Sequence, residues 1–113
     1  MHETRIACDL ARMILEVARS EGLQRITRVN LKFGQMIQIV PDIFRHAFAA
    51  ATEGTIAEHT EVFIEIIPVS VRCENCRKEA DLTGLIFRCS YCGGSMLEVI
   101  RGKEMFIQSM EGE

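Results

Sequence analysis

The sequence contains no tryptophan, one tyrosine and two prolines, and it lacks any long apolar run. Charged residues interrupt every apolar stretch before it reaches the roughly 18 residues of a membrane-spanning helix, so no membrane span is predicted. Near the start, His2, Glu3, Arg5 and Asp9 interrupt the apolar stretch that a signal peptide would need. We therefore expect a cytoplasmic protein, in a compartment where disulfide bonds are disfavoured.

The chain also lacks a cluster of lysine and arginine. Its formal net charge is −3, whereas proteins that neutralise several phosphates usually present a basic face. No nucleophile elbow, phosphate-binding glycine loop or paired-carboxylate motif is evident. These absences argue against nucleic acid as the main partner and against an enzyme.

Two segments have the spacing of amphipathic helices. From Glu3 to Glu21 apolar residues recur every three or four positions, and Gly22 follows as a stop signal. A second helix is expected from Pro41, a favoured first helical residue, to about Gly54. The apolar positions are Ile6, Leu10, Met13, Ile14 and Val17 in the first helix, and Ile43, Phe44, Ala47, Phe48 and Ala51 in the second.

Three segments alternate with the period of a strand, namely 25–33, 61–71 and 96–109. Pro68 suggests an edge position or bulge near the end of the second, Gly102 and Lys103 interrupt the third, and residues 34–40 are ambiguous. With 113 residues, the chain is predicted to form one α+β domain with a small appendage. We expect two helices packed on a three-stranded sheet, with a zinc-ribbon-like four-cysteine module inserted between the last two strands.

Four cysteines carry the strongest chemical signal. Cys73 and Cys76 form one Cys-x-x-Cys pair, and Cys89 and Cys92 form a second after 12 intervening residues. Two such knuckles supply the four thiolates that structural zinc prefers, with no open position for water or substrate. Unpaired or disulfide-bonded cysteines are the alternative, which the cytoplasmic setting disfavours. Zinc is predicted to contribute folding energy to this module.

Three other residues are weaker candidates for metal ligands. We expect Cys8, on the first helix, to be a buried thiol. His46, on the second helix, and His59, in a polar loop, are read as structural or solvated histidines.

The opening residues Met1, His2 and Glu3 raise a separate possibility. A free α-amine, the His2 amide nitrogen and the His2 imidazole can close adjacent chelate rings in one plane. A planar nitrogen set favours Ni(II) or Cu(II) over zinc, and the Glu3 backbone nitrogen or a nearby side chain could complete it. A histidine in second position also arises by chance, so the motif alone leaves open whether it binds metal.

Taken together, these features make the whole chain resemble the HypA/HybF family of nickel-insertion accessory factors for [NiFe] hydrogenase maturation. The resemblance rests on His2 and Glu3, on Val29-Asn30-Leu31-Lys32-Phe33-Gly34, on Glu53-Gly54-Thr55-Ile56-Ala57, and on Cys73, Cys76, Cys89 and Cys92. The chain departs from the family pattern at Gly34-Gln35-Met36-Ile37 and at Ser90, where a proline is common. Neither departure touches a proposed ligand.

The resemblance implies that residues 1–71 and 96–113 form a nickel-binding α/β domain and residues 72–95 a zinc-binding module. Nickel would be held transiently at Met1, His2 and Glu3, and zinc structurally by Cys73, Cys76, Cys89 and Cys92. The implied partners are a nickel-handling GTPase and the hydrogenase large-subunit precursor, while some family members assist urease. Both a monomer and a homodimer are compatible with the sequence.

Two rival functions share the cysteine knuckles. A zinc-ribbon nucleic-acid or protein-interaction module is one alternative, but a nucleic-acid binder should show basic patches and exposed aromatics, and the only tyrosine is Tyr91. A rubredoxin-like electron carrier would hold iron in the same thiolates, and its visible spectrum would distinguish it.

Overall fold

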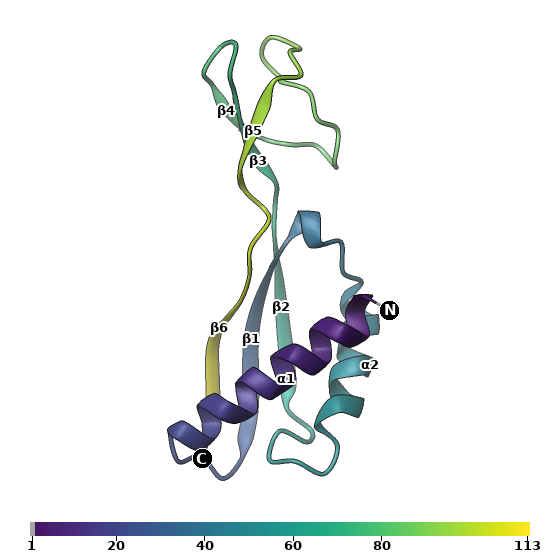
Figure 1. The fold of residues 1–113 in the computed structure, drawn as a ribbon, viewed down its shortest axis with the longest axis vertical. Helices are drawn as coiled ribbons and strands as arrows, with labels where there is room; N and C mark the ends of the chain where they lie inside the picture. Colours follow the sequence, from purple (N-terminus) through teal and green to yellow (C-terminus); the bar gives the residue numbers. More distant parts are fainter. Residues whose placement is uncertain (1) are drawn as a thin grey trace. The chain divides into compact units, whose positions relative to one another are not determined.

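A computed structural model describes residues 2–113 and shows two helices, six strands and one short 3₁₀ turn (Figure 1). The elements are α1 (His2–Ser20), β1 (Ile26–Gly34), the 3₁₀ turn Gln35–Ile37, α2 (Pro41–Thr52), β2 (Glu61–Ile67), β3 (Ser70–Cys73), β4 (Glu79–Asp81), β5 (Leu97–Arg101) and β6 (Met105–Gly112). Both predicted helices and the first predicted strand are confirmed. The predicted α+β fold class is confirmed as well.

The chain divides into two compact units. The first, the helical unit, holds the described residues up to Leu31 together with Ile39–Ile64 and Ile107–Glu113. The second, the cysteine unit, holds Lys32–Gln38 and Glu65–Phe106. The cysteine unit is larger than the zinc-binding module predicted over 72–95, and the boundaries of that module stay a prediction.

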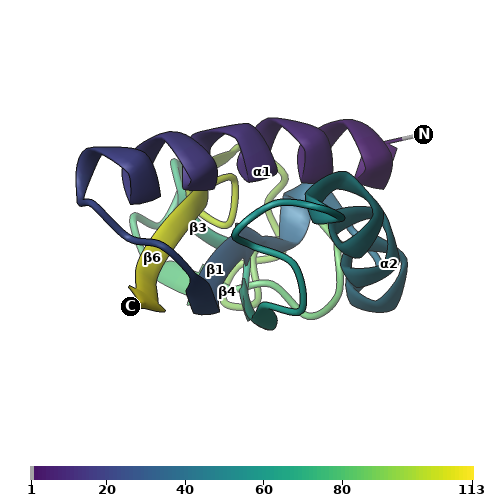
Figure 2. The same ribbon diagram turned by 90° about the horizontal axis from the view of Figure 1, so that it is seen from below.

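In the helical unit, α1 runs across β1 and β6 and also contacts α2 (Figure 2). Small residues allow this close packing, because the buried face of α1 consists of Ala7, Leu10, Ala11, Ile14 and Ala18. From α2, the stacked rings of Phe44 and Phe48 are buried, with centroids 5.9 Å apart. Met13 and Val17 belong to the predicted apolar stripe, yet they are 51% and 46% exposed.

A three-stranded sheet has the order β2-β1-β6, with β1 in the centre. Its central strand alternates as predicted, since Val29, Leu31 and Phe33 are buried and the polar residues between them are half-buried. On the polar face, Arg28 stacks over the Phe63 ring at 3.7 Å, and the Asn30 amide donates to Ser109 Oγ at 2.9 Å.

The cysteine unit has a second sheet of order β4-β3-β5, which the sequence did not predict. Strand β3 pairs antiparallel with both neighbours, placing Val71 opposite Ala80 on one side and Val99 on the other. Cys73 lies at the end of β3, opposite Leu97 of β5. The pairing of β3 with β5 therefore fixes the position of Cys73, the first candidate metal ligand.

Two strands predicted as continuous are each broken in two. The segment 61–71 forms β2 and β3, because Pro68 has no N–H to donate to a ladder. The segment 96–109 forms β5 and β6, because Gly102 adopts φ +105° and its Cα lies against the Val69 backbone, where a Cβ would come within 2.6 Å. Both expectations of one long strand were wrong. Among the described residues, no helix combines the length and apolar character required to cross a membrane.

Candidate metal centre

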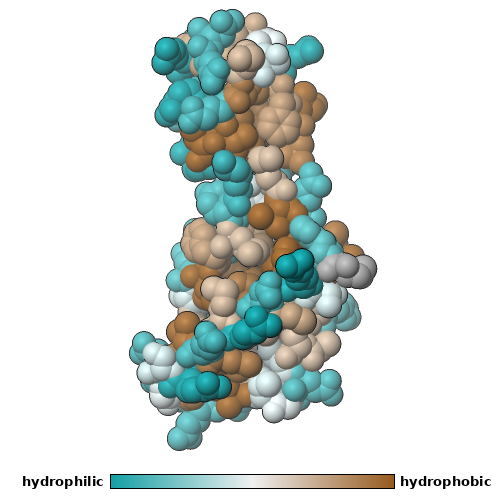
Figure 3. All heavy atoms as spheres, viewed as in Figure 1, coloured by the Kyte–Doolittle hydropathy of each residue, from teal (hydrophilic) through white to brown (hydrophobic). Residues whose placement is uncertain are grey.

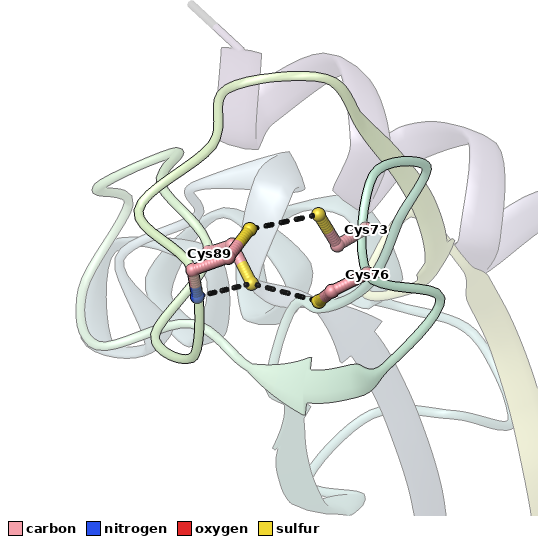
Figure 4. A group of neighbouring side chains, drawn as sticks. Cys73, Cys76 and Cys89 are labelled. Atoms are coloured by element: carbon pink, nitrogen blue, oxygen red, sulfur yellow. Dashed lines mark hydrogen bonds between the residues drawn. The ribbon is translucent and has the colours of Figure 1, made fainter.

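The four predicted cysteines converge on one point. Their sulfur atoms all lie within 4.8 Å of one another, with Cys73 Sγ 3.6 Å from Cys92 Sγ and Cys76 Sγ 3.6 Å from Cys89 Sγ. Figure 4 shows Cys73 and Cys76 facing Cys89 across the cluster. Cys73 and Cys76 come from the end of β3 and the turn after it, and the second pair comes from the segment between β4 and β5.

The two knuckles have the same backbone hydrogen bonds. The Arg77 N–H donates to the Cys73 carbonyl at 2.8 Å, and the Gly93 N–H donates to the Cys89 carbonyl at 2.9 Å. In each knuckle the N–H of the first cysteine also donates to the carbonyl five residues later, at 2.9 and 2.8 Å. Arg77 and Gly93 both have positive φ, 65° and 75°. Each knuckle therefore closes with a left-handed residue directly after its second cysteine.

Backbone N–H groups point at the sulfur of Cys89. The amides of Cys92 and Tyr91 each donate to Cys89 Sγ at 3.4 Å, and they lower the pKa of the Cys89 thiol to about 6. The Cys76 N–H does the same for Cys73, whose pKa is also lowered. At Cys92 the Gly94 N–H acts in the lowering direction, but the sulfurs of Cys73 and Cys89 raise its pKa to about 11. The backbone N–H groups thus favour the thiolate form at Cys73 and Cys89.

The sulfur cluster fits a tetrahedral zinc ion. A Zn–S bond of about 2.3 Å places tetrahedral sulfurs about 3.8 Å apart, close to the 3.6 Å found for two pairs. Four thiolates complete the shell, which is the arrangement of structural zinc. Cys73 and Cys89 are buried and Cys92 is exposed, so the cluster lies at the surface of its unit.

Apolar side chains surround this cluster at the surface. Ile86, Tyr91 and Met96 are 68%, 60% and 65% exposed, and Figure 3 shows apolar residues gathered on this part of the molecule. Near the cluster, Lys78 Nζ lies 4.7 Å from the centroid of the Tyr91 ring. Arg72 forms a salt bridge with Glu79 at 2.8 Å.

At the other candidate site, α1 begins at His2, whose side chain is exposed. Met1 lies outside the described residues. The Glu3 carboxylate accepts the Val40 N–H at 3.1 Å. Its own backbone N–H, followed by that of Val40, holds the pKa of Glu3 below its usual range. Glu3 therefore connects the first turn of α1 to the residue before α2.

The weaker candidates do not gather into a site. Cys8 is exposed on α1, so the expectation of a buried thiol was wrong. His46 and His59 are exposed, as expected of solvated histidines. Within residues 2–113, the four cysteines form the only group of three or more potential ligand side chains close enough to share a metal ion.

Sequence reasoning missed the groups that support the cysteines. The N–H donors of Tyr91 and Cys92 carry no side-chain signal. The left-handed turn at Arg77 could have been found by aligning Cys73-Glu74-Asn75-Cys76-Arg77 with Cys89-Ser90-Tyr91-Cys92-Gly93, because the glycine marks the shared position.

Comparison with known proteins gives a consistent result over the whole chain. The family described as "Hydrogenase/urease nickel incorporation, metallochaperone, hypA" matches residues 1–112. The hydrogenase maturation factor HypA of Desulfitobacterium hafniense is 34% identical over 113 residues, covering 100% of this chain and 99% of its own. That of Moorella thermoacetica is 33% identical and covers 100% of both chains. That of Chloroflexus aggregans is 35% identical over 112 residues, with 98% of each covered.

Solved structures show the same fold. The solution structure of the nickel metallochaperone HypA from Helicobacter pylori superposes with a TM-score of 0.70 at 23% identity, over 99% of this chain and 97% of that one. A second solution structure of a HypA protein gives a TM-score of 0.73, also at 23% identity, over 100% and 97%. The family match and the full-length relatives lead to one conclusion: this chain belongs to the HypA family of hydrogenase and urease nickel-incorporation metallochaperones.

Proposed function

We propose that this protein binds Ni(II) at its N-terminus and delivers it to a [NiFe] hydrogenase under assembly, without catalysing a reaction. The observation that carries this proposal is the family match over residues 1–112, supported by relatives named hydrogenase maturation factors over the full chain. The N-terminal nickel ligands and the transfer of nickel to a partner are both parts of this proposal. We propose that nickel delivery takes place in the cytoplasm.

In this proposal the nickel ligands are the α-amine of Met1, the backbone nitrogen and imidazole of His2, and the backbone nitrogen of Glu3. Supporting this set, α1 begins at His2, and the first N–H groups of a helix have no intrahelical acceptor. Nickel at the Glu3 nitrogen would displace no N–H to C=O bond within the helix, although the Glu3 carboxylate would give up its bond to its own backbone N–H. The Glu3 carboxylate, already held by the Val40 N–H, then positions the turn.

Delivery requires that the bound nickel exchange its ligands readily. His2 is exposed, and the proposed ligands come from three consecutive residues, so incoming ligands can replace them one at a time. The receiving partners we propose are a nickel-handling GTPase and the hydrogenase large-subunit precursor, with the protein acting as a monomer or a homodimer. Urease is the other enzyme in the description of the family.

Structural zinc on Cys73, Cys76, Cys89 and Cys92 completes the proposal, with 72–95 as the zinc-binding module. When bound, zinc would hold the two knuckles together and supply no chemistry to substrate, because four thiolates occupy its shell. The exposed apolar residues beside the cluster support a second role for this module as a docking surface.

The experiment that tests the proposal is metal analysis of untagged protein before and after exposure to nickel. We expect one firmly held zinc per chain, and one additional nickel that a competing chelator removes. Cys76→Ser should lose zinc while α1 and the β2-β1-β6 sheet persist by circular dichroism and NMR. Stoichiometric zinc in Cys76→Ser would refute the four-thiolate assignment, and failure of the native protein to take up nickel would refute the function.

A further inference from the structure

The β6 edge of the β2-β1-β6 sheet is unprotected. Strand β6 has a paired neighbour on one side only, and Figure 1 shows it at the margin of the sheet. Its eight residues, MFIQSMEG, contain no proline, lysine or arginine. Natural proteins usually blunt a long edge strand with such residues, because its free N–H and C=O groups can pair with another chain.

The opposite edge, β2, is blunted by comparison. Arg45 Nε donates to the Val62 carbonyl at 3.1 Å, which occupies a backbone acceptor of this strand. Glu61 and Glu65 add two charges, and Pro68 follows the strand directly. The difference between the two edges makes β6 the available one.

An apolar groove lies beside β6. Its volume is about 610 Å³, and Val17, Leu23 and Met110 supply its apolar lining. Val17 is 46% exposed and Met13, one turn earlier on α1, is 51% exposed. Figure 3 shows apolar residues on both sides of the hydrophilic stripe of α1. An extended segment paired with β6 would therefore place every second side chain in this groove.

The charges of the groove specify the chemistry of its occupant. The charged residues that line it are Glu21 and Glu111, and no cation among the described residues lines it. Arg28 approaches Glu111 to 3.5 Å from the polar face of the sheet, which leaves Glu21 to face an incoming group. A second copy of this chain would bring a β6 whose one charged residue is another glutamate, so the groove does not complement itself.

We propose that β6 and this groove form a docking site for an extended segment of a partner protein. The segment pairs with the free edge of β6, places an apolar side chain against Val17 and Met110, and directs a lysine or arginine toward Glu21. This is strand addition, in which main-chain hydrogen bonds supply affinity and alternate side chains supply specificity. The site involves none of the proposed nickel or zinc ligands.

The test uses the full-length, zinc-loaded protein and a capped eight-residue peptide, Val-Thr-Lys-Thr-Val-Thr-Lys-Thr, because alternate residues of a strand face one side and Val17, Met110 and Glu21 line one groove. We expect the peptide to slow hydrogen exchange of the β6 amides in NMR spectra. A peptide with glutamate in place of lysine should not do so. Val17→Lys should weaken binding about tenfold, roughly 1.4 kcal/mol. The matched control is Ile43→Lys, because Ile43 is 43% exposed on α2 and does not line this groove; it should bind normally.

Three results would overturn the proposal. The first is unchanged β6 exchange with the lysine peptide, and the second is equal protection by the glutamate peptide. The third is β6 protection that rises with protein concentration in the absence of peptide, which would show that a second copy occupies the edge. Binding should be the same in His2→Ala, so the result does not depend on nickel.

Discussion

At the residue scale, Arg77 and Gly93 occupy equivalent places in the two knuckles but differ in how well they suit them. Both have left-handed backbones, a conformation that costs a residue with a Cβ about 1 kcal/mol or more. Gly93 meets this requirement without cost, whereas Arg77 does not. The first knuckle therefore contains strain that the second avoids.

Substitutions at the two positions should therefore change the free energy of unfolding differently. Gly93→Ala is expected to lower the free energy of unfolding by about 1 kcal/mol, through backbone strain, because no atom beyond the two neighbouring residues lies within 4 Å of the added Cβ. Arg77→Gly should raise it slightly or leave it unchanged. Guanidinium denaturation of the zinc-loaded proteins measures both, and destabilisation of equal size would show that the two turns are not equivalent.

Glu104 stabilises the turn between β5 and β6 through hydrogen bonds to the backbone. Its carboxylate accepts its own backbone N–H and those of Gly102 and Lys103, the last two at 2.5 and 2.7 Å, and these bonds lower its pKa. Because the folded pKa lies below the unfolded one, the stabilisation is complete above the ordinary carboxyl pKa. It is lost as the pH falls through the folded value.

Glu104→Gln should therefore be less stable than the native protein at pH 7 and equally stable at a pH below the folded pKa. Glu61→Gln, at an exposed position on β2, is the control and should match the native protein at both ends. Thermal unfolding across the acid range provides the comparison. A stability difference that persists in acid would assign the effect to packing rather than to the charge.

At the element scale, the periodicity of apolar residues predicted the long helices and the long strand β1, and it failed where strands were short or interrupted. The spacing of apolar residues was sufficient for α1 and α2, and alternation for β1. Strands β3 and β4 have four and three residues, too few for a period to register. Pro68 and Gly102 were visible as irregularities, but the close approach of their backbones depends on residues far apart in the sequence.

That close approach also involves Gly34. A Cβ there would lie 2.1 Å from the Gly102 carbonyl oxygen and 2.6 Å from the Lys103 nitrogen. Neither atom belongs to a flexible side chain, so the backbone itself must move. Gly34→Ala should cost about 3 kcal/mol, at the upper end of overpacking. Gly84→Ala adds only positive-φ strain and should cost about 1 kcal/mol; equal losses in guanidinium denaturation would contradict the close contact.

At the scale of the whole molecule, the cysteine cluster was predictable and its surroundings were not. The spacing of the two Cys-x-x-Cys pairs indicated one centre without knowledge of the fold. The amides that lower the pKa of Cys89, and the exposed position of Cys8, depend on how the backbone turns and which helix face is covered. Met13 and Val17 illustrate the same limit, because helical spacing identified an apolar stripe but could not show that alanines would occupy its buried centre.

The N-terminus gives the most direct test of the proposed function, in which backbone nitrogens and the His2 imidazole bind nickel together. Nickel should be titrated calorimetrically into zinc-loaded native protein, His2→Ala, and protein with a short N-terminal extension that preserves every side chain. We predict one nickel per chain in the native protein and none in the other two, with zinc content unchanged in all three. Comparable nickel affinity in all three proteins would contradict the account and place the cargo elsewhere.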